Sequence, residues 1–530
     1  MKRTVFCLLF QIIICSAFSQ STIDVLNYQF HIELNDNNDS IYGAAIIKFV
    51  VREKKTAIQF DLTGLKKEGK GMIATVVGYK NADGIEIFKQ ENEKLIIPSK
   101  FNKGDTAEVI INYKGIPADG LIISKNKYNK RTFFSDNWPN RAHNWIPCND
   151  DPADKASVEF IVVAPMHYQI ISNGVLVEET NSPANKKETH WKEEVPLPTK
   201  VMVIGAADFA VNYVGDVNCI PVSSWVYPEN RKEGFYDYAQ AKDILSFFIN
   251  YIGPFPYKKL ANVQSKTIFG GMENAGAIFY SEESITGKRE EEDLLAHEIV
   301  HQWFGDMATE KSFCHLWLSE GFATYLSHIY LETKYGAEKL NELMLQDRDK
   351  VIDFVNSSHK PVVDSVSPLM QLLNPNSYQK GGWILHMLRR ELGDSVFKKC
   401  VRQYYSTYAG KNANTTDLKN VFENASGKKL DKFFSQWLYS SVNPSLKLSW
   451  KYNAKEKKIQ ATVQQLQSGT IFNFPLDAEI ILADGKKIIK RIAVANQSEK
   501  VDWPVNSKPV SIKLDPDVSL LFEGTVAELK

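Results

Sequence analysis

Two histidines four residues apart, His297 and His301, are the part of the sequence with the clearest chemical use. On a helix, side chains at positions i and i+4 lie above one another on the same face, so both imidazoles can point to a single metal ion. Imidazole nitrogens suit a tetrahedral zinc ion. Glu298 directly follows the first histidine and borders the same point, where a carboxylate can take a proton from an attacking water. The segment therefore predicts a catalytic zinc site.

A third ligand is expected because a catalytic zinc ion keeps three protein ligands and one open position for water. Glu320 lies nineteen residues after His301, at the start of a second amphipathic run. The apolar residues of that run are Leu316, Phe322, Ala323, Leu326, Ile329 and Tyr330. A helix with this apolar face can pack against the first helix and deliver the Glu320 carboxylate. We expect His297, His301 and Glu320 to hold one zinc ion per chain.

Two motifs resemble those of a known family. His297 to His301 together with Glu320 resembles the gluzincin pattern, and a segment upstream resembles the Gly-x-Met-Glu-Asn exopeptidase signature of the M1 zinc aminopeptidases, the family of aminopeptidase N and leukotriene A4 hydrolase. That segment consists of Gly270, Gly271, Met272, Glu273 and Asn274. The resemblance extends from about Tyr28 to the C-terminus. It implies a short, secreted, three-domain zinc aminopeptidase that removes N-terminal residues from peptides.

The resemblance also implies a role for individual residues. In the family, the Gly-x-Met-Glu-Asn segment is an edge strand that pairs with the extended substrate, and its glycines let the substrate backbone approach closely. Glu273 would accept the substrate's α-ammonium, and Glu298 would act as the general base. Tyr378-Gln379-Lys380-Gly381 resembles the family's Tyr-x-Lys-Gly segment, whose tyrosine binds the developing oxyanion. A tyrosine suits this role because its hydroxyl donates a hydrogen bond while it stays neutral.

One position departs from the family pattern. Trp145 to Pro152 resembles the family's Pro-Cys-x-Asp motif, and many members carry a Gln or Glu some nine residues before the Pro-Cys, where it helps to hold the substrate's amine. An ungapped count places Trp138 there. An indole cannot accept a hydrogen bond from an ammonium. Either Asp136 takes this role, or Glu273 alone recognises the amine.

Three alternatives to an aminopeptidase remain open. A thermolysin-like endopeptidase would share the zinc ligands but has no use for the Gly-x-Met-Glu-Asn segment. An epoxide hydrolase of the leukotriene A4 kind carries an Asp and a Tyr eight and five residues before the catalytic tyrosine, and Met370 and Leu373 stand at these positions here. An inactive peptide-binding protein would be expected to lack Glu298 or Tyr378, and both are present.

The composition is that of an ordinary globular protein. At 530 residues the chain is too long for a single core, so roughly two to four domains are expected. Lys plus Arg and Asp plus Glu both total 63. This balance gives no indication of nucleic-acid binding or of an acidic tail. We therefore expect peptides as partners and no nucleic acid.

The first residues predict export. Lys2 and Arg3 precede an apolar run from Val5 to Ile14, and Ala17-Phe18-Ser19 forms a small-x-small cleavage pattern. Because the run is too short to span a bilayer, residues 1–19 are expected to be a secretory signal peptide, and the protein to be periplasmic or extracellular. No later stretch predicts a transmembrane helix. Of the six cysteines, the four outside this segment form no Cys-x-x-Cys pair, so isolated buried thiols are expected.

Residues 20–213 predict an N-terminal antiparallel β domain, which the resemblance also implies. From Tyr28 to Leu34 apolar and polar residues alternate, which is the pattern of a half-buried strand. Asn173-Gly174 follows a further strand-like run and predicts a β-hairpin. No helical period of any length occurs before about residue 230.

Residues 214–443 predict the catalytic domain, which the resemblance identifies as thermolysin-like α/β. A helical period extends from Phe235 to about Gly253, and Leu260 to Gln264 then predicts a strand. The helix with the two histidines should begin at the acidic residues 290–293, which favour the positive end of a helix dipole. It should end near Met307.

Residues 444–530 have the length of an immunoglobulin-like β-sandwich. Pro444 marks the boundary, apolar and polar residues alternate beyond it, and Asp484-Gly485 predicts a hairpin turn. The predicted fold class is therefore multidomain α+β. It consists of an N-terminal antiparallel β domain, a thermolysin-like zinc domain and a C-terminal sandwich.

Overall fold

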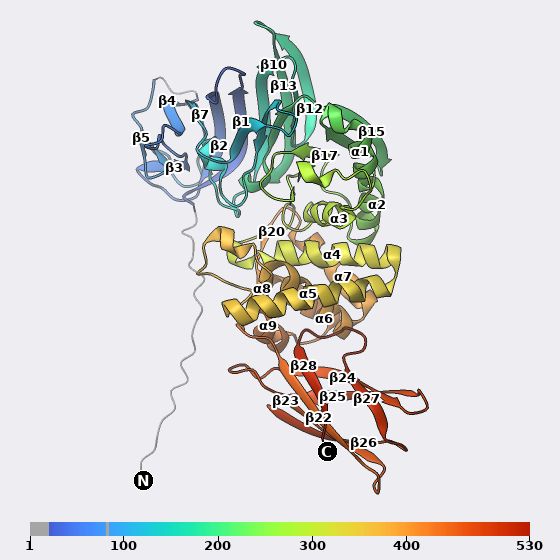
Figure 1. The fold of residues 1–530 in the computed structure, drawn as a ribbon. Coiled ribbons are helices and arrows are strands. Elements are labelled where there is room, and N and C mark those ends of the chain that lie inside the picture. Colours follow the sequence, from blue (N-terminus) through green and yellow to red (C-terminus); the bar gives the residue numbers. More distant parts are fainter. Residues whose placement is uncertain (1–20, 81–83, 530) are drawn as a thin grey trace, which may run out of the picture.

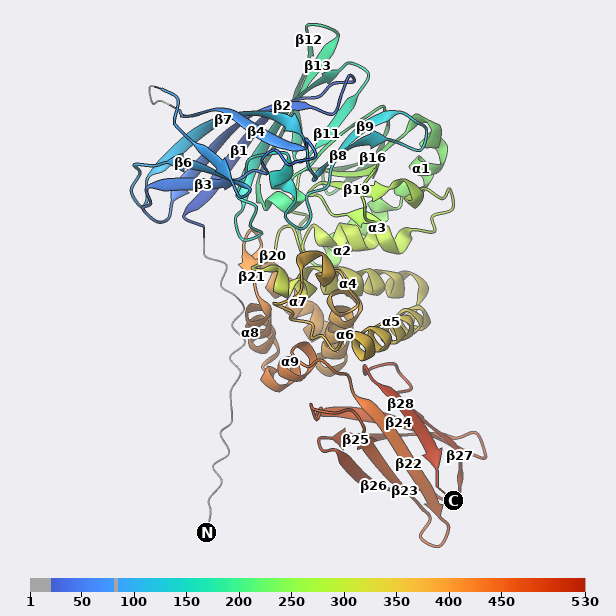
Figure 2. The same ribbon diagram turned by 60° about the vertical axis from the view of Figure 1, so that its left-hand side comes forward.

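The structure, a computed structural model, describes residues 21–80 and 84–529. The predicted signal peptide, residues 1–19, lies outside the described residues. The chain forms three regions in sequence order, with β-sheets first, a largely helical region in the middle and further β-sheets last (Figures 1 and 2). This is the mixed α and β organisation that the sequence predicts. Within the described residues, helices that are both long and apolar enough to cross a membrane do not occur.

A seven-stranded sheet dominates the N-terminal region, with the order β12-β13-β10-β1-β2-β7-β4. Its strands are β1 (Ile23–Glu33), β2 (Ile41–Val51), β4 (Gly71–Tyr79), β7 (Thr106–Ile116), β10 (Ala156–Pro165), β12 (Val175–Ser182) and β13 (Lys186–Leu197). In β1 the alternating apolar residues Tyr28, Phe30 and Ile32 are buried, in agreement with their period of two. The sheet is not purely antiparallel, because β1 and β10 run parallel, with Asn27 opposite Ser157. A parallel neighbour needs a long connection, and β10 follows β1 only after several other strands.

Two smaller sheets complete this region, with the orders β11-β14-β9-β8 and β3-β6-β5. Their strands are β3 (Ala57–Asp61), β5 (Lys89–Glu91), β6 (Lys94–Pro98), β8 (Leu121–Lys125), β9 (Arg131–Ser135), β11 (Gln169–Ser172) and β14 (Ile204–Ala207). The loop after β9 and the residue before β10 contact the central region, because Asp136 accepts a hydrogen bond from the Ile268 amide and Lys155 donates one to the Asp306 carbonyl. This β region can therefore contribute residues to a site there.

The hairpin predicted at Asn173-Gly174 is wrong. β11 before it pairs with β14, whereas β12 after it pairs with β13, so the turn carries the chain from one sheet to another. The buried Asn173 amide donates to the carbonyls of Val201 at 2.9 Å and Ala275 at 2.8 Å. These bonds to distant segments, rather than pairing between the flanking strands, hold the turn. Gly174 supplies the positive φ of 73° that the turn requires.

A five-stranded sheet opens the central region, with the order β15-β16-β17-β19-β18. Its strands are β15 (Ala210–Val217), β16 (Ile220–Val226), β17 (Leu260–Ser265), β18 (Gly271–Met272) and β19 (Ala277–Ser281). The strand predicted at Leu260–Gln264 is β17. β18 pairs antiparallel with β19 and stands at the edge of the sheet. The expected boundary between residues 213 and 214 lies within β15.

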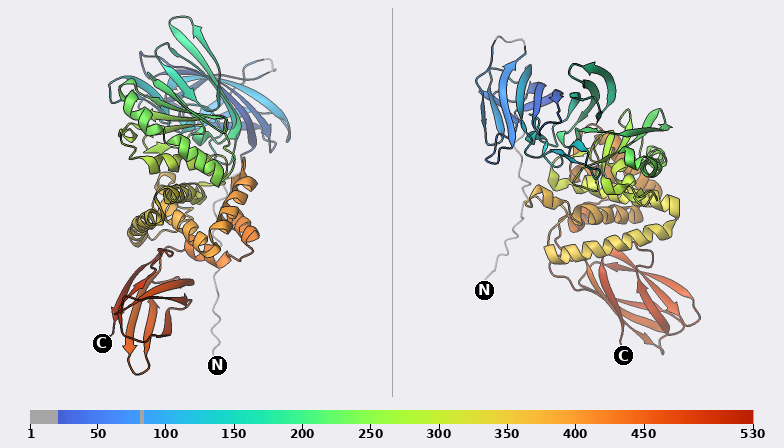
Figure 3. Two further views of the ribbon diagram at one scale, coloured as in Figure 1. Left: turned by 90° about the vertical axis from the view of Figure 1, so that its right-hand side faces the viewer. Right: turned by 45° about the horizontal axis from the view of Figure 1, so that its top comes forward.

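Helices fill the space between this sheet and the C-terminal sheets (Figure 3). They are α1 (Arg231–Tyr238), α2 (Ala241–Tyr251), α3 (Glu292–His301), α4 (Trp317–Tyr335), α5 (Ala337–Ser358), α6 (Gly381–Leu392), α7 (Asp394–Tyr408), α8 (Thr415–Ser426) and α9 (Asp431–Leu438). The helical period predicted from Phe235 to about Gly253 is divided into α1 and α2. Two short strands, β20 (Thr309–Glu310) and β21 (Asn412–Ala413), pair in parallel beside them.

The helix that carries the two histidines ends earlier than predicted. α3 stops at His301, six residues before Met307. The amide of Asp306 donates to the His301 carbonyl at 3.1 Å, and the amide of Gly305 donates to the Ala308 carbonyl at 3.0 Å. Gly305 adopts a φ of +122°. A sharp turn that only a glycine accommodates easily therefore replaces the last predicted helical turn.

The C-terminal region consists of two sheets, with the orders β26-β23-β22-β28 and β25-β24-β27. The strands are β22 (Ser445–Asn453), β23 (Lys458–Gln465), β24 (Phe474–Leu482), β25 (Lys487–Val494), β26 (Ser498–Pro504), β27 (Pro509–Leu514) and β28 (Glu523–Glu528). The hairpin predicted at Asp484-Gly485 connects β24 and β25. Arg348 on α5 joins this region to the helices, because its Nη2 lies 2.6 Å from Asp515 Oδ2 and 2.7 Å from the Leu520 carbonyl.

The cysteines of the described residues form no disulfide with one another. Cys148, Cys314 and Cys400 are buried, as the sequence predicts, whereas Cys219 is exposed. Cys219 follows β15 in a tight turn to β16, where its side chain has no core to enter. Packing, hydrogen bonds and ion pairs therefore hold the described residues together, without disulfides among them.

Candidate active site

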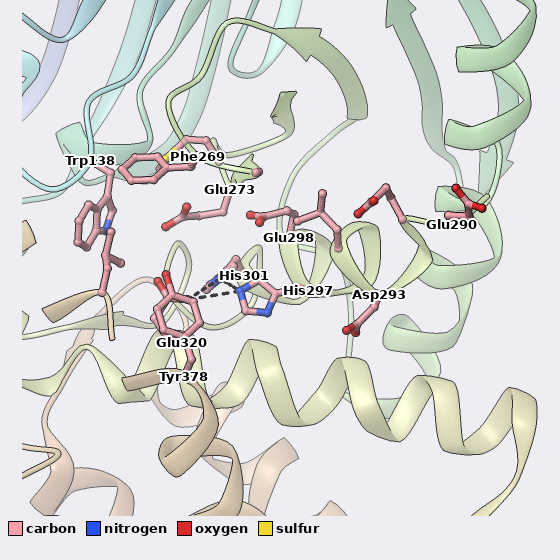
Figure 4. Close-up of a pocket in the computed structure, with 16 residues that line it drawn as sticks. Trp138, Phe269, Glu273, Glu290, Asp293, His297, Glu298, His301, Glu320 and Tyr378 are labelled. Atoms are coloured by element: carbon pink, nitrogen blue, oxygen red, sulfur yellow. Dashed lines mark hydrogen bonds and ion pairs between the residues drawn. The ribbon is translucent and has the colours of Figure 1, made fainter. Parts of the chain in front are cut away.

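α3 and the first turn of α4 bring the three predicted metal ligands to one point (Figure 4). His297 and His301 lie one turn apart on α3, and their Nε2 atoms are 3.0 Å apart. Oε2 of Glu320 lies 3.4 Å from Nε2 of His297 and 3.3 Å from Nε2 of His301. Across residues 21–80 and 84–529, these three are the His, Cys, Asp or Glu side chains whose ligand atoms lie close enough together to hold a metal ion.

The turn after α3 fixes the orientation of His301. Its Nδ1 lies 3.1 Å from the Phe304 carbonyl and 3.1 Å from Oγ of Ser319. When Nδ1 carries the proton and donates it to the carbonyl, Nε2 keeps a free lone pair that points at Glu320. Metal-ligating histidines commonly use their second nitrogen in this way. Because α3 ends at His301, the Phe304 carbonyl lies where it can accept a hydrogen bond from Nδ1, the His301 nitrogen that does not face Glu320.

The charges around these residues fit a metal cation. Burial alone would lower the pKa of the His301 imidazole, but nearby carboxylates, chiefly that of Glu320, raise it to about 10. Burial pushes the pKa of Glu320 upward, yet the two imidazoles, first that of His301, hold it well below its usual range. Among the described residues, Oε2 of the buried Glu320 has no well-oriented hydrogen-bond partner. Two imidazole nitrogens and such a carboxylate oxygen are a donor set that catalytic zinc takes.

Glu298 projects from α3 into the same space, next to β18 (Figure 4). A Cβ at position 271 would overlap the Glu298 carboxyl group, so the glycine leaves room for it. At position 270 the nearest atom to such a Cβ would be Cδ1 of Leu294 at 3.8 Å. Burial raises the pKa of Glu298 well above its usual range, and the nearby carboxylate of Glu273 contributes. A carboxyl group with a raised pKa is suited to take up and hold a proton.

Tyr378 lies beside His297, with the ring centroids 5.9 Å apart and an angle of 14° between the ring planes. It belongs to a π-helical turn, Asn376–Lys380, that leads directly into α6. Single π turns inside helices occur frequently at functional sites. Burial raises the pKa of Tyr378 well above its usual range, and the Glu320 carboxylate adds to the effect. The hydroxyl is therefore neutral and can donate a hydrogen bond.

Four of the five residues of the Gly-x-Met-Glu-Asn segment line the cavity, and the fifth, Asn274, does not. Residues 270–273 line the cavity, and β18 leaves the outer edge of its sheet open. Glu273 is buried, and its Oε1 has no hydrogen-bond partner among the described residues. The backbone carbonyl of Glu273 accepts a hydrogen bond from Nε2 of Gln302 at 2.7 Å. Asn274 is also buried and does not line the cavity, and its contact with substrate stays a prediction.

These residues surround a cavity of about 430 Å³. Its walls are formed by Trp138, Phe269, Gly270, Gly271, Met272, Glu273, Glu290, Glu291, Asp293, Leu294, His297, Glu298, His301, Glu320, Leu373 and Tyr378. In Figure 4, Trp138 and Phe269 stand at one end, Glu290 and Asp293 stand toward the other, and Glu298 lies between them. The sequence did not identify Phe269 and Leu294, although each neighbours a motif. Phe269 precedes Gly270, and Leu294 lies three residues before His297 on the helix.

Asp136 does not line the cavity that contains Glu273 and the three predicted metal ligands. Its side chain is fully buried outside the cavity and forms an ion pair with Arg141 Nη2 at 2.5 Å. Its other oxygen accepts hydrogen bonds from the Thr267 hydroxyl and the Ile268 amide, each at 3.0 Å. Asp136 therefore holds the loop that leads to β18, whereas Trp138 forms part of the cavity wall.

A buried ion pair joins the N-terminal β region to the turn after α3. Lys200 Nζ lies 2.5 Å from Oε1 of Glu310 on β20, and both side chains are almost completely excluded from solvent. Lys155 supports the same turn, because its Nζ donates to the carbonyls of Asp306 and Met307 at 3.1 and 2.7 Å. Neither lysine has a sequence signal that reveals its burial. Their partners lie more than a hundred residues away.

Lys200→Met is expected to lower the free energy of unfolding by about 3–5 kcal/mol, because it leaves the Glu310 carboxylate buried without its partner. The double variant Lys200→Met/Glu310→Leu is the matched control, since removal of both charges from a buried pair is often close to neutral. Thermal and denaturant unfolding of the intact chain measure both. Equal destabilisation of the single and double variants would contradict the role given to this pair.

Comparisons with known proteins place both regions that build the site in one family. The chain matches the Peptidase M1 N-terminal domain over residues 25–201 and the Peptidase family M1 domain over residues 236–437. Probable aminopeptidase 2 of Sulfurisphaera tokodaii is 27% identical over 425 residues, which cover 73% of this chain and 52% of the relative. Probable aminopeptidase 1 of the same organism is 25% identical over 522 residues, which cover 93% and 62%.

The chain is also similar to an aminopeptidase from a vertebrate. Endoplasmic reticulum aminopeptidase 1 of Mus musculus is 28% identical over 359 residues, which cover 64% of this chain and 38% of the relative. The chain spans about half the length of the curated relatives it matches, for example 52% of one and 50% of another. The matched segments contain all three predicted metal ligands, Glu298, Glu273 and Tyr378. The chain belongs to the M1 family of peptidases.

Proposed function

We propose that this protein is a zinc-dependent aminopeptidase that removes single residues from the N-termini of peptides. The observation that carries the proposal is the position of Glu273. This buried carboxylate has an unpartnered oxygen and lines the same cavity as the three metal ligands, beside an open sheet edge. An acceptor at a fixed distance from the reacting bond makes an enzyme count residues from the chain end.

The substrate backbone is expected to extend along β18, where it adds a strand to the open edge of the sheet. Glu273 accepts hydrogen bonds from the α-ammonium and so places the first peptide bond near the metal ligands. A zinc ion held by His297, His301 and Glu320 would polarise the scissile carbonyl and acidify the attacking water.

Two further residues act on the proton of the attacking water and on the negative charge that develops on the substrate oxygen. Glu298 takes the proton of the attacking water and passes it to the leaving amine. The neutral hydroxyl of Tyr378 donates a hydrogen bond to the oxygen that becomes negative. Both side chains line the cavity, as this division of roles requires.

The alternatives receive less support from the residues of the cavity. An endopeptidase needs space on both sides of the scissile bond, whereas Trp138 and Phe269 stand at one end of this cavity (Figure 4). Leu373, an apolar residue of the cavity wall, stands where an epoxide hydrolase of the leukotriene A4 kind carries a tyrosine. A protein that only binds peptides has no need for a general base, yet Glu298 lines the cavity.

A panel of aminoacyl reporter substrates, assayed with and without a chelator, tests the proposed function directly. We expect turnover that requires one zinc ion per chain, and no turnover when the substrate's amine is acetylated. Elemental analysis of the same samples relates activity to metal content. Equal cleavage of free and acetylated peptides would support an endopeptidase, and zinc without turnover of any substrate would support a peptide-binding protein.

Glu273→Ala is expected to lower kcat/KM on aminoacyl substrates by about 10- to 200-fold, because the loss of one charge-assisted hydrogen bond costs about 1.5–3 kcal/mol. It should also reduce the preference for free over acetylated N-termini. Glu273→Gln is the matched variant, since it keeps the volume of the side chain and removes the charge. Unchanged kcat/KM in zinc-loaded Glu273→Ala would exclude this residue as the amine acceptor.

We further propose that residues 1–19 direct export to the periplasm or the extracellular space, and that the C-terminal sheets form an immunoglobulin-like sandwich beside a thermolysin-like catalytic domain. The basic start, apolar run and small-residue cleavage pattern support the first proposal. The two facing sets of strands support the second. N-terminal sequencing of protein from a secreting host tests export, and a mature chain that still begins at Met1 would refute it.

A further inference from the structure

One end of the cavity is an aromatic wall built by residues from two different regions of the chain. Trp138 comes from the N-terminal β region and Phe269 from the loop before β18, and their ring centroids are 6.0 Å apart at an angle of 89°. The Trp138 ring also contacts Phe313 edge to face, with centroids 5.9 Å apart. Packing on two sides leaves the indole only 2% exposed. The indole is therefore a fixed part of the cavity wall.

Arg141 and Asp136 hold both halves of this wall in place. Nε of Arg141 donates to the backbone carbonyl of Trp138 at 2.7 Å, and its guanidinium lies over the ring of Phe269 at 5.9 Å. Asp136 binds the Arg141 guanidinium and also the Ile268 amide, next to Phe269. The wall is therefore preorganised, and a substrate does not have to build it.

The aromatic wall carries one polar group that can face a substrate. Trp138 offers only an indole N–H, which has no hydrogen-bond partner among the described residues. Figure 4 shows the indole nitrogen on the side of the ring toward Glu273. Next to Glu273, the aromatic wall thus adds apolar surface and one donor, but no acceptor for a second positive charge.

We propose that Trp138 is a specificity-determining residue that makes the subsite for the substrate's first side chain apolar, so that uncharged apolar first residues are preferred over Lys and Arg. The inference rests on the proposed function, because Glu273 must hold the amine for the first side chain to reach this wall. An apolar side chain gains from leaving water against the two rings. A lysine or arginine side chain placed against this wall would lose water next to an N–H donor and find no acceptor on the wall, because the carboxylates of Glu290 and Asp293 stand toward the other end of the cavity (Figure 4).

Ratios of kcat/KM on leucyl, phenylalanyl, alanyl, lysyl and arginyl reporter substrates test the inference. We expect the zinc-loaded protein to favour the leucyl and phenylalanyl substrates over the lysyl and arginyl ones by about tenfold or more. Trp138→Gln introduces an acceptor and should reduce this preference by about tenfold. Trp138→Phe keeps a ring against Phe269 and Phe313 and should retain the preference. These ratios do not depend on the amount of active enzyme in each preparation.

Trp450→Phe on β22 is the matched control, because it removes an indole far from the cavity and should leave all ratios unchanged. Zinc content and melting temperature are measured for each variant. If the wild-type protein cleaves lysyl or arginyl substrates as well as leucyl ones, the inference is refuted while the proposed function stands. The same holds if folded, zinc-loaded Trp138→Gln keeps the wild-type ratios. Absence of turnover on every substrate would refute the proposed function and this inference with it.

Discussion

Glu298→Gln is expected to reduce kcat by about 10²- to 10⁴-fold or more while the protein keeps its fold and its metal. The amide fills the same volume beside Gly271 but cannot take the proton of the attacking water. Glu298 is buried next to β18. Bulk water therefore cannot reach the same position and act as the base in its place. Steady-state kinetics, elemental analysis and the binding of a non-hydrolysed peptide separate loss of chemistry from loss of structure.

Glu342→Gln on α5 provides the control for this change. It makes the same chemical substitution at an exposed glutamate far from the cavity, so kcat should stay within about twofold of the wild-type value. If Glu298→Gln retained zinc and turned over substrate within about tenfold of the wild type, Glu298 would not be the general base.

His301→Ala is expected to remove metal and activity together. His301 is the most enclosed of the two imidazoles, and its Nε2 is directed at both His297 and Glu320. Loss of an outer hydrogen bond to a ligand typically costs about 10- to 100-fold in metal affinity, so loss of the ligand itself should exceed that range. Zinc content after dialysis against graded concentrations of chelator measures the affinity independently of catalysis.

Ser319→Ala tests the effect of a residue that contacts the predicted metal ligand His301 but is not itself a ligand. Oγ of Ser319 lies 3.1 Å from Nδ1 of His301, but the Phe304 carbonyl lies at the same distance and remains in the variant. We therefore expect zinc affinity to fall by no more than about tenfold, and activity to recover in excess zinc.

Full activity in metal-free His301→Ala would contradict the assignment of a zinc site.

Patterns with short sequence range were the most informative for this protein. The spacing of His297 and His301 places two imidazoles on one helix face whatever the rest of the fold does, because a helix repeats about every 3.6 residues. The alternation in β1 and the turn at Asp484-Gly485 are equally local, and both have the predicted form. The edge position of β18 was implied by the resemblance of residues 270–274 to a family segment and not by their own pattern, and β18 stands at the edge of its sheet.

Features that depend on distant partners were not predictable in this way. Asn173-Gly174 has the composition of a hairpin turn, but hydrogen bonds to residues 201 and 275 make it a crossing between sheets. α3 has no sequence signal that ends it at His301, apart from Gly305, whose turn closes on Ala308. The parallel pairing of β1 with β10 joins strands more than a hundred residues apart.

The proposed recognition of the substrate's amine rests on both kinds of information. A count along the sequence identifies Trp138 as a departure and leaves Asp136 and Glu273 as candidate acceptors. Only the packing distinguishes between them, because Arg141 and the 267–268 backbone take up the hydrogen-bonding capacity of Asp136, whereas Glu273 keeps a free oxygen in the cavity. Residue types and short spacings define which groups can act on a metal and a peptide. Which of them are free to do so depends on burial and on partners from other parts of the chain, which a single sequence does not specify.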